Sequence, residues 1–178
     1  MAILRRLSLL ALAASFVVGL TTASASGVPD QQIRAGFLYN FAMFVEWPTT
    51  PLGDPLLVGV LGDDVFASAL RSIDGRAANG RKIVVRPVDE SDDLARTSIL
   101  YVGHADDRSA AATLARVGKK PVLTVGHSPR FTQVGGIVRL YTDGGKLRFE
   151  INTDRSNECA LRISSKLLNL AKIVKEPR

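Results

Sequence analysis

Short apolar runs that alternate with helical segments constrain the fold of this chain most strongly. The runs occupy residues 56–61, 82–88, 98–103 and 121–126, and glycine closes three of them. The segments 65–73 and 106–117, which lie between runs, have helical spacing. Strands that alternate with helices predict a mostly parallel central sheet with helices on both faces. We therefore expect an α/β fold, a three-layer sandwich.

The last third of the chain follows a different pattern. The strand-like runs 136–142 and 146–152 flank Asp143-Gly144-Gly145, which predicts that the sheet ends in an antiparallel hairpin. From about Thr153 we expect one long amphipathic helix. Its apolar stripe would hold Ile163, Leu167, Leu170 or Ala171, and Val174. Its solvated face would hold Arg162, Lys166, Asn169 and Lys172.

A helix is also predicted near the amino terminus, over residues 30–46, with Asp30 available as its cap. Four apolar residues recur there at four-residue intervals: Ile33, Phe37, Phe41 and Val45. The segment carries more large rings than one apolar stripe needs, so we expect Tyr39 and Trp47 to lie at its edge. Amphipathic rings at such an edge suit a partner-binding or ligand-binding surface.

The first 25 residues have the layout of a secretory signal peptide. Arg5 and Arg6 precede an apolar run over 7–20, and Ala23-Ser24-Ala25 follows it. The run is shorter than the roughly 20 residues that cross a bilayer as a helix. We therefore predict cleavage after Ala25, export to the periplasm and a single domain over 26–178, with no membrane insertion after cleavage. An uncleaved amino-terminal anchor is the alternative.

Charge and cysteine content exclude some functions. The signal peptide contains two of the 23 basic residues, so its loss lowers the net charge from +6 to +4. The remaining basic residues are scattered, whereas a nucleic-acid-binding protein groups them on one face. Cys159 is the only cysteine, so no intramolecular disulfide can form. We predict that its thiol is buried.

Polar residues follow the glycines that close three strands: Asp63, His104 and His127. Because the carboxyl ends of parallel strands share one edge, these side chains could converge on a small molecule or a metal ion. The alternative is that Asp63 or Asp64 caps a helix and that both histidines are exposed loop residues. The chain lacks the common hydrolase, P-loop, zinc-protease and dinucleotide-binding motifs, so we predict neither an enzyme nor a bound cofactor or metal.

Three groups of segments, taken in order, carry a family resemblance. The first is 33–48, which ends in Phe44-Val45-Glu46-Trp47-Pro48. The second joins 60–64 to the pairs Gly75-Arg76 and Gly80-Arg81. The third comprises 123–126, 135–137, 148–152 and 161–168. Together they resemble the YfiR family of periplasmic proteins over nearly the whole mature chain.

This resemblance implies a periplasmic homodimer that represses an inner-membrane diguanylate cyclase, or a sensor kinase, by binding its periplasmic sensory region. Cyclic di-GMP levels and biofilm formation would follow. The residues expected to bind the partner are Tyr39, Trp47, Arg162, Lys166 and Asn169. The family pattern includes paired cysteines, which this chain lacks, so a disulfide switch within one chain is ruled out. The alternative function is small-molecule binding through Asp63, His104 and His127.

Overall fold

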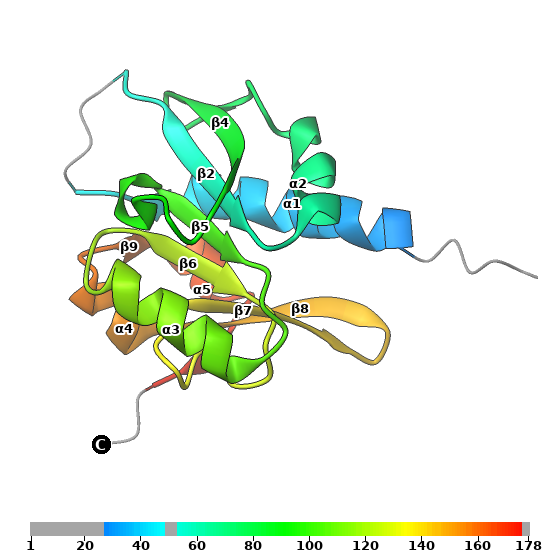
Figure 1. The fold of residues 1–178 in the computed structure, drawn as a ribbon, viewed down its shortest axis with the longest axis vertical. Helices are drawn as coiled ribbons and strands as arrows, with labels where there is room; N and C mark the ends of the chain where they lie inside the picture. The colour runs from blue at the N-terminus through cyan, green and yellow to red at the C-terminus, as the bar shows by residue number, and fades with distance from the viewer. Residues whose placement is uncertain (1–26, 49–52, 176–178) are drawn as a thin grey trace, which may run out of the picture.

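A computed structural model describes residues 27–48 and 53–175 (Figure 1). The predicted signal peptide and its cleavage after Ala25 lie outside these residues. The main sheet contains β2 (Leu56–Leu61), β3 (Ala77–Ala78), β4 (Arg81–Val88), β5 (Ile99–Val102), β6 (Leu123–Gly126), β7 (Val138–Asp143), β8 (Lys146–Asn152) and β10 (Lys172–Val174). The helices are α1 (Gly27–Phe44), α2 (Asp64–Ala69), α3 (Asp107–Val117), α4 (Thr153–Glu158) and α5 (Ser165–Leu168), with 3-10 turns η1 (Leu70–Ser72) and η2 (Leu94–Arg96).

The main sheet has the strand order β10-β8-β7-β6-β5-β2-β4-β3. Neighbours from β4 to β7 are parallel, and β7 pairs antiparallel with β8. The hairpin forms because Gly144 and Gly145 both adopt positive φ, as a tight turn between antiparallel strands requires. The predicted mostly parallel sheet and its hairpin are confirmed. The hairpin is not the edge of the sheet, because β10 adds a parallel strand outside β8.

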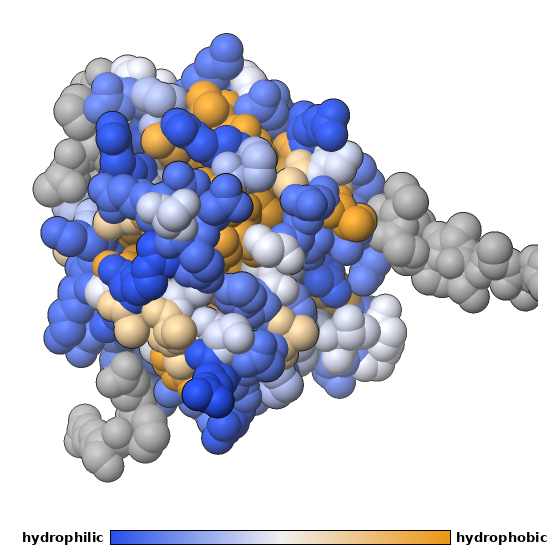
Figure 2. All heavy atoms as spheres, in the orientation of Figure 1, coloured by the Kyte–Doolittle hydropathy of each residue, from blue (hydrophilic) through white to orange (hydrophobic). Residues whose placement is uncertain are grey.

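Helices cover both faces of the sheet, as predicted (Figure 1). On one face α1 and α2 pack over a core that includes Phe41, Phe66 and Phe149. On the other face α3 packs over a second core that includes Leu114 and Phe131. The view in Figure 2 shows a largely hydrophilic surface with apolar side chains exposed in places.

Close packing explains two of the glycines that close strands. A Cβ on Gly126 would lie 2.3 Å from the Phe131 ring, and a Cβ on Gly136 would lie 2.2 Å from the same ring. A Cβ on Gly103 would lie 2.6 Å from the carbonyl oxygen of Leu61. Only glycine fits at these positions without movement of the backbone or a core ring.

The amino-terminal helix is confirmed, but its buried face differs from the predicted stripe. Phe41 and Val45 are buried as expected, whereas Ile33 is 51% exposed and Leu38 is buried instead. Each four-residue step along a helix turns the side chain by about 40° beyond a full circle. Ile33 therefore lies about 80° around the helix from Phe41, and Val45 lies just beyond the end of α1.

The prediction of one long carboxyl-terminal helix is wrong. The helix α4 ends before Cys159, and Ala160 then takes a left-handed conformation with φ 56°, which a helix cannot continue through. The next residues form β9 (Arg162–Ile163), which pairs antiparallel with β1 (Val45–Glu46). The short helix α5 and strand β10 follow. Arg162, Lys166, Asn169 and Lys172 thus do not share one helix face.

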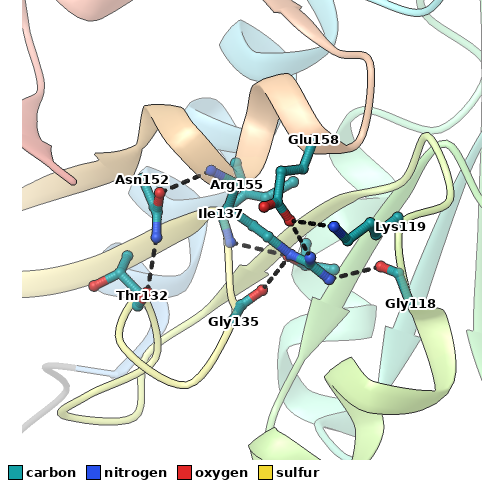
Figure 3. A network of polar contacts seen from close by, with 9 residues as sticks. Gly118, Lys119, Thr132, Gly135, Ile137, Asn152, Arg155 and Glu158 are labelled. Carbon is teal, nitrogen blue, oxygen red and sulfur yellow. Dashed lines mark hydrogen bonds and ion pairs between the residues drawn. The ribbon is translucent and has the colours of Figure 1, made fainter. Parts of the chain in front are cut away.

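Arg155 links this segment to the rest of the molecule (Figure 3). Its guanidinium donates to the carbonyl oxygens of Gly118 at 2.7 Å and Gly135 at 3.2 Å. The side chain of Asn152 caps α4 by accepting from the Arg155 backbone N–H, and its amide donates to the carbonyl of Thr132. These bonds fasten the start of α4 to the end of α3 and to the loop before β7.

Candidate functional site

The ring of Trp47 is held at the end of β1 by two contacts. Its indole N–H donates to the carbonyl oxygen of Ser98 at 3.0 Å. The Arg81 guanidinium lies 5.9 Å from the centre of the ring, within the range of a cation–π interaction. Trp47 is half-buried, so part of it remains exposed to solvent.

Tyr39, which lies in α1, is held by the same two kinds of contact. Its hydroxyl donates to the carbonyl of Ala77 at 3.2 Å, and the Arg76 guanidinium stacks 3.8 Å from the ring centre. Tyr39 therefore lies against Arg76 of the Gly75-Arg76 pair, and Trp47 lies against Arg81 of the Gly80-Arg81 pair. The loop 75–81 brings both arginines to α1 and the turn after it.

Arg81 is almost fully buried, and its guanidinium makes three hydrogen bonds through Nε and one terminal nitrogen. It donates to the carbonyls of Asp54 at 2.9 Å and Pro55 at 2.8 Å, and to the Ser98 hydroxyl at 3.3 Å. Burial lowers the pKa of Arg81 from its ordinary value, and the Asp54 carboxylate opposes this shift. Even so, arginine stays charged in proteins. It therefore supplies a fixed cation beneath Trp47.

Two hollows open on either side of Trp47 and Arg81, which line both. The larger, of about 390 Å³, has an apolar wall of Met43, Phe44, Val45 and Leu56 and polar groups from Glu46, Asn79 and Ser164. The smaller, of about 250 Å³, runs toward Arg96 and Pro121. We call the surface formed by Tyr39, Trp47, the loop 75–81 and the segment 162–169 the aromatic edge.

The β1–β9 pairing brings part of the carboxyl-terminal segment to the aromatic edge. Arg162 lies opposite Glu46, the residue before Trp47, and the Ser164 backbone N–H donates to the carbonyl of Phe44. Arg162, Lys166 and Asn169 are exposed. They come from β9, from α5 and from the residue that caps α5. Although the predicted helix is wrong, these residues lie on a segment that reaches the rings.

Each of the three residues predicted at the carboxyl edge of the sheet makes a different contact. Asp63 caps α2 by accepting from the Phe66 N–H at 2.9 Å, as one alternative predicted. His104 pairs with Glu90 at 3.0 Å. His127 lies 3.2 Å from the hydroxyl of Tyr101. Within 27–48 and 53–175, no three or more His, Cys, Asp or Glu side chains are placed to hold a metal ion.

Burial dominates the electrostatics at this edge. It raises the pKa of Tyr101, whose side chain is fully buried, to about 12. It also lowers the pKa of His127, with Arg34 acting in the same direction and Asp63 opposing it. Both groups are therefore neutral at pH 7, and their hydrogen bond is a structural contact between β5 and the residue after β6.

Cys159 is buried, as predicted, and only 2% of it is exposed. Burial raises the pKa of its thiol. Because the thiolate is the reactive form, this environment disfavours nucleophilic chemistry.

No helix in the described part of the chain is long and apolar enough to span a bilayer.

Comparison with known proteins decides the family. The profile of the YfiR/HmsC-like family matches residues 31–172, most of the chain. The chain belongs to the YfiR/HmsC-like family. The match begins within α1 and ends at β10, so it includes every segment of the aromatic edge.

A solved structure shares the fold of this YfiR/HmsC-like protein. It is the crystal structure of a conserved domain protein from Vibrio cholerae O1 biovar El Tor, with a TM-score of 0.54 and 11% sequence identity. The alignment covers 82% of this chain and 60% of the Vibrio protein, so the chain spans about 60% of that protein's length. At this identity the likeness shows the fold alone.

The sequence reasoning missed the roles of Arg76, Asn79 and Arg81. The Asp-Gly and Asn-Gly pairs within 74–81 predict a turn, but not that this turn folds back onto α1. The stacking of guanidinium groups on Tyr39 and Trp47 depends on contacts between residues more than 30 positions apart. The sequence did contain a clue to these contacts. Two arginines and two aromatic rings had no predicted packing partner, and an arginine commonly stacks on a ring.

Proposed function

We propose that this protein is a periplasmic repressor that binds the periplasmic sensory region of an inner-membrane diguanylate cyclase through the aromatic edge. The observation that carries the proposal is the fixing of Tyr39 and Trp47 by the guanidinium groups of Arg76 and Arg81 beside a hollow with an apolar wall. Rings that are already immobile lose little conformational entropy when a partner covers them. Trp, Tyr and Arg are also the residues that dominate interface energies.

The charges around the edge support a partner surface with acidic groups. Arg76, Arg162 and Lys166 are exposed, and their side chains form no ion pair with another described residue. Unpaired cations around an apolar centre steer an acidic partner and raise the association rate more than the final affinity. A homodimer, which family resemblance implies, remains part of the proposal and is tested by measuring molar mass in solution.

The direct test is a titration of the mature protein with the purified periplasmic region of an inner-membrane diguanylate cyclase from the same cell. Reversing Arg162 and Lys166 to Glu together should slow association about tenfold while the unfolding midpoint stays unchanged. The matched control reverses Arg108, in the first turn of α3, and Lys120, in the segment after α3; both are exposed, and this variant should bind like the wild type. Equal association rates for both double variants would remove the segment 162–169 from the interface.

In cells, the same two double variants should differ in the cyclic di-GMP level that they allow. With the cognate cyclase present, the Arg162/Lys166 reversal should raise cyclic di-GMP above the wild-type level, and the Arg108/Lys120 reversal should not. Periplasmic protein levels must match for the comparison to hold. Full repression by the first variant would contradict the proposed role of this segment and leave Tyr39 and Trp47 to be tested alone.

Small-molecule binding is the second candidate function, and the hollow beside Trp47 favours it. Its volume of about 390 Å³ falls in the range of ligand sites, which begins near 300 Å³. Screening small molecules for a rise in unfolding temperature that Trp47→Ala abolishes would support a ligand at this position. The carboxyl edge of the sheet is the less favoured place, because His104 is engaged by Glu90.

A further inference from the structure

Asn79 occupies an unusual backbone position next to the aromatic edge. Its φ is 49°, and Asn79 and Ala160 are the only non-glycine residues with positive φ in the described part of the chain. Asparagine tolerates this left-handed conformation better than most residues. The turn places its side-chain amide against α1, where the nitrogen donates to the carbonyl oxygens of Ala42 and Val45, both at 3.3 Å.

These two carbonyls stand on either side of the point where α1 becomes β1. Ala42 is in the last turn of the helix, whose carbonyls have no partner within the helix, and Val45 is the first residue of the strand. Trp47 follows two residues later. The amide of Asn79 therefore bridges the junction that sets the direction in which the chain carries Trp47.

The residues around Asn79 extend this contact along the loop. Arg76 holds Tyr39 on one side, and Arg81 lies against Trp47 on the other. We infer that Asn79 is a positioning residue for the partner-binding edge, which acts by fixing the helix-to-strand turn beneath Trp47. The part of this inference that concerns the partner rests on the proposed function. The part that concerns the ring does not.

Fluorescence measures the position of the ring directly, because Trp47 is the only tryptophan in the chain. Asn79→Gly keeps the freedom to adopt positive φ and removes the amide. Asn79→Asp keeps the size of the side chain but places a carboxylate against two carbonyl oxygens. We expect the acrylamide quenching constant of Trp47 in the mature protein to rise about twofold in Asn79→Gly, and more in Asn79→Asp.

The control is Asn157→Gly, an exposed substitution in α4, which lowers helix propensity and touches neither Trp47 nor β1. A merely structural role for Asn79 would lower the unfolding temperature as this control does and leave quenching at the wild-type value. That result in Asn79→Gly would overturn the inference. If Asn79→Gly fails to fold, Asn79→Asp decides by the same two measurements.

Binding adds a second readout. The affinity of Asn79→Gly for the periplasmic region of the cyclase should fall about tenfold, because ordering the loosened turn on binding costs about as much as one net hydrogen bond contributes. If the wild type does not bind this region, the proposed function fails, and quenching alone still decides whether Asn79 positions Trp47. If the wild type binds and Asn79→Gly binds equally well, the role in partner binding is overturned.

Discussion

Changing Phe41 to Ala tests whether α1 is fastened to the sheet as the structure shows. The ring is fully buried and lies 6.3 Å from the ring of Phe37 and 5.4 Å from that of Phe149, measured between centres. Truncating a buried Phe to Ala costs about 3 to 5 kcal/mol through lost burial and the cavity that remains. The loss of the two ring pairs is part of this measured cost, so we expect about 4 kcal/mol.

The assay is urea unfolding of the mature protein, followed by circular dichroism and by Trp47 fluorescence. For a domain of this size, 4 kcal/mol corresponds to a fall in unfolding temperature of roughly 8 to 16 °C. Ile33→Ala is the matched control, because Ile33 lies on the same helix but is 51% exposed, and it should cost less than about 1 kcal/mol. Equal losses in the two variants would refute the buried face assigned to α1.

Three further predictions concern single contacts. Arg155→Ala removes bonds to two carbonyls and to Glu158, so chemical unfolding should show a loss of about 2 to 4 kcal/mol; a loss below 1 kcal/mol would mean that water replaces them. Asp63→Ala should cost about 1 kcal/mol as a lost cap, whereas Asp64→Ala, which caps nothing, should cost less in the same measurement. His127 has a lowered pKa when folded, so the unfolded chain binds more protons and stability should fall as the pH drops below about 6.5. His127→Gln should flatten this dependence in unfolding experiments between pH 5 and about 7, and an unchanged slope would assign it to another group.

The central sheet was predictable from the sequence because its signals are local. Parallel strands buried on both faces form continuous apolar runs, and β5 and β6 are buried at every position. The carboxyl-terminal segment was not predictable in this way. Residues 162–163 and 172–174 complete their hydrogen bonds with β1 and β8, so distant partners decide between strand and helix. The apolar spacing of Ile163 and Leu167 fits a helix equally well.

For the candidate sites too, the position of the residues was predictable from the sequence, whereas the contacts of their side chains were not. The rule that carboxyl ends of parallel strands share an edge correctly gathered Asp63, His104 and His127 at one edge of the sheet. It said nothing about where each side chain turns. That choice is made by the helix N-terminus above Asp63, by Glu90 and by Tyr101, and only the last two involve residues far along the chain.

The aromatic edge, which we propose as the partner-binding surface, depends on the fold for its arrangement. The guanidinium of Arg81 is already committed to carbonyl and hydroxyl oxygens, so it holds Trp47 without offering a group for proton transfer. Three segments far apart in sequence, the end of α1, the loop 75–81 and the strand β9, must be in place before the edge exists. A surface assembled from such contacts is present only in the folded domain. It presents its rings in one arrangement, and a partner that recognises this arrangement bears little of the ordering cost of binding.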